Sequence, residues 1–278
     1  MFEKGGYELS LMNIRVVLLT TRYVVGVFGK LVYLHCAIFL FLFGFMESRQ
    51  RSAYQRTKRL TDKIAQKLSV NVHAVKFRPI DFLSILVVAP VFEDWAWRYL
   101  KLKRGDIFVD VGAHIGKYTC TIARLVGNRG RVVAVEAHPK NYEWLVGNID
   151  LNKLTNVVPL NLAAYDHNCK VRIFEGANSS GRSSIKINEG SSSLDVQAKA
   201  LDTVPELASL PRIDLVKIDV EGAEYETILG MLRLLTAHKP RLLLEAWDFF
   251  KLRPLLRRIG YARIIEASHE RGYYFLSP

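Results

Sequence analysis

A glycine-containing segment, VDVGAHIGKYT at residues 109–119, has residue types that could bind a nucleoside ligand. Gly112 and Gly116 let the backbone pass close to a ligand, where a Cβ atom would collide. In the dinucleotide fingerprint G-x-G-x-x-G, helix N–H groups bind a pyrophosphate. Here Asp110 stands where that fingerprint would begin. Because a carboxylate repels a diphosphate and pairs with the ammonium of a methionine moiety, the segment predicts S-adenosylmethionine rather than NAD. A tight strand–helix turn with no ligand is the alternative.

Further residues of a cofactor site are expected at the ends of the next two strands. Glu136 ends an apolar run, and an acid at this place accepts hydrogen bonds from ribose hydroxyls. Ala163 and Ala164 end the following run, where a small apolar wall for adenine is needed. The predicted cofactor contacts also include their neighbours in these turns, Ala113, His114 and Ala137.

Several carboxylates follow two later strands, in KIDVEGAE at residues 217–224 and at Glu245 in RLLLEAW. Ligands bind beyond the carboxyl ends of parallel strands, so a methyl acceptor should approach here. Grouped carboxylates can deprotonate a hydroxyl or hold a divalent metal. We predict Asp219 beside the cofactor and in catalysis, and both Glu221 and Glu245 as candidate bases; whether a metal takes part stays open. Glu224 is equally well explained by its favourable charge at a helix N-terminus.

The elements that must position these residues alternate between apolar strand-like runs and amphipathic helix-like runs. Strands that are apolar on both faces and alternate with helices predict a parallel sheet covered on both sides. The last two runs are joined by a turn too short for a parallel crossover, so they must pair antiparallel. A serine-rich surface hairpin is expected at residues 169–187. The expected sheet strands lie at 106–112, 131–137, 156–164, 213–220, 241–247, 262–268 and 273–277.

The N-terminal part has a different composition, and we divide the chain into residues 1–75 and 76–278. Residues 24–46 are strongly apolar and long enough for one membrane span of about 20 residues. The basic stretch that follows predicts a cytoplasmic catalytic domain, because positive charge stays on that side. An interfacial helix or a buried core helix are the alternatives. The fold predicted for the whole chain is thus a mostly parallel α/β sheet with a C-terminal antiparallel hairpin, behind an N-terminal helical membrane segment.

Whole-chain charge and cysteine content add weaker constraints. The formal net charge of +12 favours an anionic neighbour, such as lipid head groups, nucleic acid or an acidic glycan. The three cysteines, Cys36, Cys120 and Cys169, have no paired spacing, so neither a zinc site nor a disulfide framework is indicated.

From about Val91 to the C-terminus the chain resembles the FkbM-type methyltransferases. The resemblance is carried by FEDW, GDIFVDVGAHIGKYT, VVAVEAHP, LAAYD, ALDTV, IDLVKIDVEGAE and LLLEAW, in this order. It implies a Rossmann-like methyltransferase fold, S-adenosylmethionine as cofactor, and a sugar, polyketide or glycolipid-like hydroxyl as acceptor. It assigns Asp110, Gly112 and Gly116 to the cofactor loop, Glu136 to the ribose, and Asp219, Glu221 and Glu224 to the family's D-x-E-x-x-E run. The long apolar N-terminal segment departs from the family pattern.

The function predicted from the sequence is O-methylation of a sugar or glycolipid-like hydroxyl at the cytoplasmic membrane face. A nicotinamide oxidoreductase is the first alternative, against which Asp110 and the closing hairpin argue. A membrane-tethered binding module without catalysis is the second. A nucleic-acid methyltransferase would suit the net charge, but the chain lacks an N/D-P-P-Y-type motif.

Overall fold

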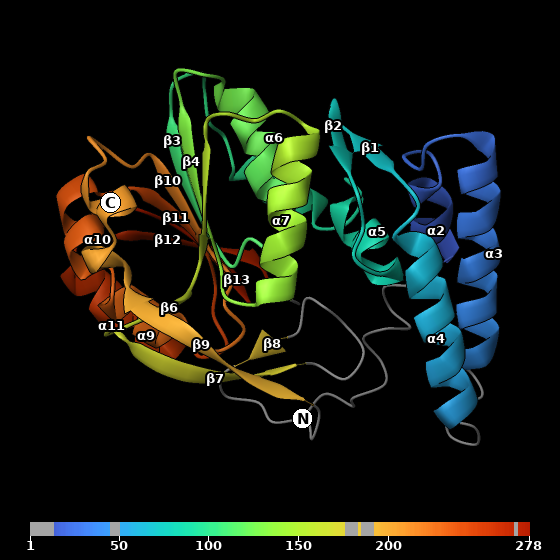
Figure 1. Cartoon of the computed structure of the whole chain (residues 1–278). Helices are drawn as coiled ribbons and strands as arrows, with labels where there is room; N and C mark the ends of the chain where they lie inside the picture. The colour runs from blue at the N-terminus through green and yellow to red at the C-terminus, as the bar shows by residue number, and fades with distance from the viewer. Residues whose placement is uncertain (1–13, 45–50, 176–182, 185–191, 270–271) are drawn as a thin grey trace. The chain divides into compact units, whose positions relative to one another are not determined.

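The computed structural model describes residues 14–44, 51–175, 183–184, 192–269 and 272–278 (Figure 1). The chain forms two compact units, residues 1–94 and 95–278, and each is described by itself.

The first unit is mainly helical. Tyr33 of α3 is fully buried, and its ring stacks on Phe82 with the ring centroids 5.2 Å apart. Helix α5 begins with a capping box, in which the Asp81 carboxylate accepts the N–H of Ser84 and the Ser84 hydroxyl accepts the N–H of Asp81. The elements are α2 (Ile14–Thr20), α3 (Val27–Gly44), α4 (Arg51–Ala65), β1 (Val70–Val72), β2 (Val75–Phe77) and α5 (Phe82–Val88).

The prediction that residues 24–46 cross a membrane, and with it the membrane segment of the predicted fold, is wrong. Within the described ranges, no helix combines the length and the apolar character that a bilayer crossing requires. Part of the apolar character of α3 serves packing within the unit, since Tyr33, Cys36 and Ala37 are buried there.

The second unit is built on a seven-stranded sheet with the order β12-β13-β11-β10-β3-β4-β5. The five strands from β5 to β11 run parallel, whereas β13 pairs antiparallel with both β11 and β12. This agrees with the predicted mostly parallel sheet and its antiparallel hairpin. The strands are β3 (Ile107–Val111), β4 (Arg131–Glu136), β5 (Val157–Asn161), β10 (Leu215–Ile218), β11 (Arg241–Glu245), β12 (Arg263–Ser268) and β13 (Tyr273–Ser277).

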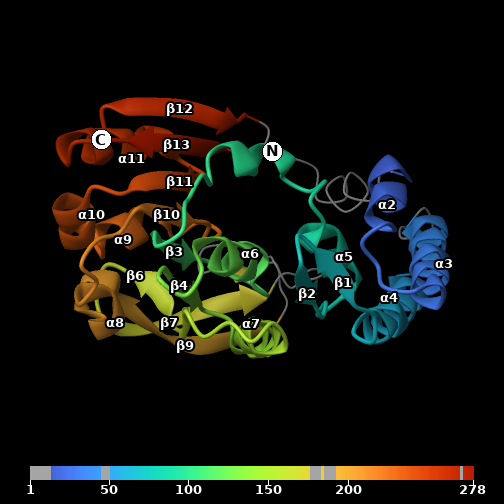
Figure 2. The same ribbon diagram turned by 90° about the horizontal axis from the view of Figure 1, so that it is seen from above.

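Helices cover both faces of this sheet, as Figure 2 shows for β10 and β3, which lie between α6 on one side and α9 and α10 on the other. Phe108 and Val132 point to the face with α6 and η1, while Val109 and Val133 point to the opposite face. Every residue of β3 is buried, as expected for a strand covered on both sides. The helices are η1 (Asp94–Arg98), α6 (Lys117–Val126), α7 (Pro139–Leu151), η2 (Leu201–Thr203), α8 (Pro205–Ala208), α9 (Glu224–Leu229), α10 (Leu232–His238) and α11 (Phe249–Arg258).

The run expected as one strand at residues 156–164 forms two strands in different sheets. Its first part is β5, and its end is β6 (Ala163–Tyr165) of a smaller four-stranded sheet with the order β6-β9-β7-β8. This sheet has its own apolar cluster around Ala163, Ile173 and Val196. Its other strands are β7 (Cys169–Glu175), β8 (Ser183–Ser184) and β9 (Ser193–Ala200). Of the expected serine-rich hairpin, residues 176–182 and 185–187 lie outside the described residues.

Candidate active site

The cofactor loop between β3 and α6 has the left-handed turns that its glycines suggest. Gly112 has φ +82° and Gly116, which precedes α6, has φ +93°. A Cβ atom on Gly112 would lie 1.7 Å from the main-chain oxygen of Asp219, so the loop and the end of β10 are in direct contact. His114 also has a positive φ, +52°, at a position where a side chain is disfavoured.

The N–H groups of this loop are largely used within the protein. Those of Gly112 and Ala113 donate to the oxygen of Val135, and that of Gly116 donates to the oxygen of Ala113. The N–H of His114 donates to Glu136 Oε2 at 2.7 Å. A diphosphate site needs loop N–H groups that point at the ligand. These four are committed elsewhere.

Glu136 lies at the end of β4 in a fixed orientation. Its Oε2 accepts the N–H of His114, and its Oε1 accepts the N–H of His138 at 3.0 Å. The residue is 7% exposed. Its Oε1 also accepts a long hydrogen bond from the side-chain amide of Asn141, at 3.4 Å. A ribose hydroxyl could use the second lone pair of Oε2, and one at Oε1 would replace the contact with Asn141.

The two predicted apolar residues and their neighbours lie at adjacent strand ends. Ala163 and Ala164 are buried in β6, and the hydroxyl of Thr227 donates to the oxygen of Ala164 at 3.2 Å. Ala137 follows Glu136, and its oxygen accepts the amide of Asn161 at 3.3 Å.

Asp110 is completely buried beneath the loop. Its Oδ2 accepts the hydroxyl of Thr119 at 2.6 Å, and its Oδ1 lies 3.8 Å from the ammonium of Lys217. Burial raises the pKa of Asp110, and the charge of Lys217 and the Thr119 hydrogen bond act against this shift. By contrast, the Asp219 side chain is 25% exposed. Of these two carboxylates, Asp219 is therefore the one that a ligand can reach.

Three carboxylates form an acidic cluster, which consists of Asp219, Glu221 and Glu245. Their oxygens lie within 4.8 Å of one another, at the carboxyl ends of β10 and β11. Glu221 lies in the turn after β10 with φ +51°, and its main-chain oxygen accepts the Ser184 hydroxyl at 2.6 Å. The structure thus brings together the three predicted catalytic residues. Their spacing would also suit a divalent cation, but grouped carboxylates alone do not establish a metal site.

Because the carboxylates of the acidic cluster lie so close together, the pKa values of Asp219 and Glu245 shift in opposite directions. Burial, the charge and hydrogen bond of Asp219, and the charge of Glu221 raise the pKa of Glu245 to about 12, so Glu245 carries a proton at neutral pH. Burial would raise the pKa of Asp219, but Lys217 and the hydrogen bonds from Glu245, Tyr273 and Lys217 lower it to about 2. Asp219 is therefore the ionised partner of a protonated Glu245.

Glu224 has a structural task at the same turn. It is buried, and its Oε1 accepts the N–H of Gly222 at 2.6 Å, next to the left-handed Glu221. The sequence placed Lys217 at this strand end without a role and did not assign Tyr273 to the site, and both side chains bind Asp219. Lys217 is the only charged residue within the buried β10, and a charge in such a strand indicates a functional role from sequence alone. No pattern in the neighbouring sequence indicated a role for Tyr273.

The family models and the relatives that this chain matches are all methyltransferases. Residues 110–273 match the family model described as the methyltransferase FkbM domain, and residues 47–163 match that of protein-L-isoaspartate(D-aspartate) O-methyltransferase. The chain is 26% identical over 190 residues to the hexuronic acid methyltransferase AglP of Haloferax volcanii, covering 64% of this chain and 76% of that protein. It is 25% identical over 214 residues to the methyltransferase sdnD of Sordaria araneosa, covering 66% and 82%.

Among solved structures, the methyltransferase FkbM from Methylobacillus flagellatus KT aligns with 95% of this chain at 14% identity and a TM-score of 0.49. The match spans 58% of that chain, less than two thirds of its length.

Proposed function

Since the chain belongs to the FkbM methyltransferase domain family, we propose that it is an S-adenosylmethionine-dependent methyltransferase acting on a sugar or glycolipid-like hydroxyl. The observation that carries the proposal is the composition of the edge formed by β3, β4, β10 and β11. The N–H groups of Gly112, Ala113, His114 and Gly116 are committed within the protein. Three carboxylates lie close together at the ends of β10 and β11, where a ligand would bind. Such an edge suits a cationic nucleoside better than a diphosphate.

The residues present fit this cofactor. When bound, S-adenosylmethionine supplies a methyl group on a positively charged sulfur. Glu136 would accept hydrogen bonds from the ribose hydroxyls. Ala163 and Ala164 belong to different apolar clusters on opposite faces of β6, so one of the two, and not both, would provide the predicted apolar wall for adenine. The ionised Asp219 would face the positive charge of the methionine half.

The acidic cluster handles the proton of the acceptor. Glu221 and Glu245 were the two candidate bases from the sequence, but a carboxyl group that holds its own proton cannot take up another. The raised pKa of Glu245 therefore favours Glu221 as the base. Glu221 would take up the proton of the acceptor hydroxyl as that oxygen gains the methyl group, and the cofactor's sulfur would leave as a neutral thioether with the electron pair of the broken carbon–sulfur bond. The rest of the catalytic effect comes from positioning.

The acceptor class is supported by one relative. AglP is named for methylation of a hexuronic acid, and a hydroxyl on such a sugar ring is a methyl acceptor of the proposed kind.

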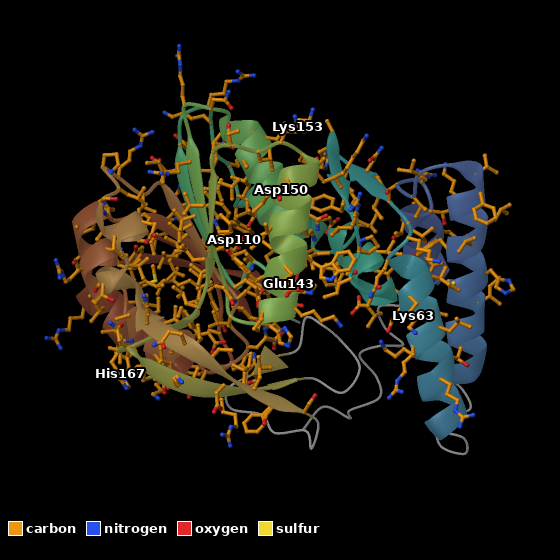
Figure 3. All side chains as sticks on the ribbon, viewed as in Figure 1. Lys63, Asp110, Glu143, Asp150, Lys153 and His167 are labelled. Carbon is orange, nitrogen blue, oxygen red and sulfur yellow. The ribbon has the colours of Figure 1, made fainter. Side chains whose placement is uncertain are left out.

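Cofactor binding is the first test. Titration calorimetry of the full chain should show binding of S-adenosylhomocysteine and none of NADH. Glu136→Ala should weaken the binding roughly 10-fold or more, because the ribose hydroxyls lose a charged acceptor. The matched control is Glu143→Ala, which removes an exposed carboxylate on the outer helix α7 (Figure 3). Failure of the wild-type chain to bind S-adenosylhomocysteine would refute the proposal.

The acceptor is tested separately. Purified chain is incubated with S-adenosylmethionine and oligosaccharides that do or do not contain a hexuronic acid, and the products are weighed by mass spectrometry. A mass gain of one methylene group on the sugar, absent with Glu221→Gln, is expected.

A further inference from the structure

The buried Lys217 connects the cofactor loop with the acidic cluster. It is 2% exposed, and its ammonium lies 3.1 Å from Asp219 Oδ2, 3.5 Å from the oxygen of Gly112 and 3.8 Å from Asp110 Oδ1. A buried ammonium is costly unless charged and polar oxygens surround it. One cation thus serves two carboxylates from neighbouring strands.

Tyr273 binds the same carboxylate from the antiparallel strand β13. Its hydroxyl donates to Asp219 Oδ2 at 2.7 Å. The side chain is 2% exposed, and its ring lies 4.9 Å from that of Trp95, measured between the ring centroids. Because Lys217 and Tyr273 both donate to Oδ2, the carboxylate of Asp219 cannot rotate without breaking both hydrogen bonds.

The main chain of Asp219 is fixed as well. Its oxygen lies where a Cβ atom on Gly112 would be, and its N–H donates to the oxygen of Val111 at 3.0 Å. Side chain and main chain of Asp219 are therefore both held against the cofactor loop, while a quarter of the side chain stays open to a ligand.

We propose that Tyr273 and Lys217 are positioning residues, which hold Asp219 in the one orientation that receives the ammonium of the cofactor's methionine half. This inference rests on the proposed function. Preorganised charge costs no rearrangement when the ligand arrives, so the effect belongs to binding of the amino-acid part of the cofactor. The adenosine part is held by other residues and does not depend on Tyr273.

The test compares two ligands on the full chain by titration calorimetry. S-adenosylhomocysteine carries the amino-acid part, and 5′-methylthioadenosine lacks it. Tyr273→Phe keeps the ring against Trp95 and removes only the hydroxyl. It should lower the affinity for S-adenosylhomocysteine roughly 10- to 100-fold, as expected for the loss of a hydrogen bond to a charged group. The affinity for 5′-methylthioadenosine should stay unchanged.

The control is Tyr274→Phe, next along β13. The Tyr274 ring stacks on Phe249 with the centroids 3.6 Å apart, away from Asp219, so both affinities should stay as in the wild type. Lys217→Met should also lower the affinity for S-adenosylhomocysteine and not that for 5′-methylthioadenosine, by a larger factor than Tyr273→Phe. Because Lys217→Met leaves two carboxylates without their cation and destabilises the fold as well, Tyr273→Phe is the deciding variant.

Each outcome has one reading. Unchanged binding of S-adenosylhomocysteine by Tyr273→Phe overturns the inference. An equal loss of affinity for both ligands, together with a lower melting temperature, would also overturn it, because this result would show a merely structural role. A wild-type chain that binds neither ligand would instead refute the proposed function.

Discussion

Gly112 is the residue at which the cofactor loop touches the end of β10, and its replacement tests that contact. A Cβ atom would meet the oxygen of Asp219, and the φ of +82° is strained for any side chain. Gly112→Ala should therefore lower the free energy of unfolding by about 3 kcal/mol or more. The control Gly147→Ala, in helix α7 with nothing within 4 Å of its Cβ position, should raise it by about 0.5–1 kcal/mol. Urea denaturation of both variants measures the difference, and an equal effect would contradict the contact.

Glu245 predicts a pH dependence of stability. Its pKa is raised to about 12 in the folded protein, so between about pH 4.3 and that value the folded chain holds one more proton than the unfolded chain. The contribution of this group to stability therefore falls as the pH rises. Glutamine is neutral in both states. Glu245→Gln should have a higher melting temperature than the wild type, by a margin that grows from about pH 6 to about pH 9. A margin that stays constant would show that Glu245 is ionised in the folded protein.

The residues of the site differ in how far local sequence revealed them. Asp110, Gly112 and Glu136 stand in a motif or at a strand end, where type and spacing carry the information. Tyr273 lies 54 residues from Asp219 and meets it only because β13 pairs with β11. No short-range pattern encodes that pairing, so this partner could not be found from the sequence.

At the scale of elements, alternation of strand and helix was sufficient to predict the parallel sheet and its antiparallel ending. The run at residues 156–164 was not sufficient to show that the chain changes sheets at Leu162, because residues 157–160 and 163–164 are all apolar and only Asn161 interrupts them. The membrane span predicted at residues 24–46 was wrong, since no helix of the described residues is long and apolar enough to cross a membrane, and part of the apolar surface of α3 packs within the first unit.

Strand β8 offers a prediction at this scale. Its Ser184 hydroxyl donates to the main-chain oxygen of Glu221, so the small sheet steadies the turn that carries the proposed base. Ser184→Ala removes about 1 kcal/mol of net hydrogen bonding and should speed exchange of the turn amides several-fold. Hydrogen-exchange mass spectrometry of a peptide covering residues 219–224 measures this. Ser193→Ala, an exposed serine of β9, serves as control and should leave the peptide unchanged.

At the scale of the whole molecule, every residue of the candidate site belongs to the second unit. The apolar clusters on both faces of its sheet consist, within the described residues, of residues between Trp95 and Leu276. Residues 95–278 expressed alone should therefore fold and bind S-adenosylhomocysteine with the affinity of the full chain. Calorimetry on the two proteins checks this, and a large loss would show that residues 1–94 contribute to the site. The predicted boundary between residues 75 and 76, the cytoplasmic location and the anionic partner stay predictions.

The placement of β13 between β11 and β12 has a consequence for biosynthesis. All five parallel strands precede Tyr273 along the chain, so the parallel part of the sheet can form while Asp219 still lacks its phenol donor. The hairpin of β12 and β13 then joins the edge at β11 through β13. A polypeptide that stops before Tyr273 should accordingly bind S-adenosylhomocysteine more weakly than the full chain.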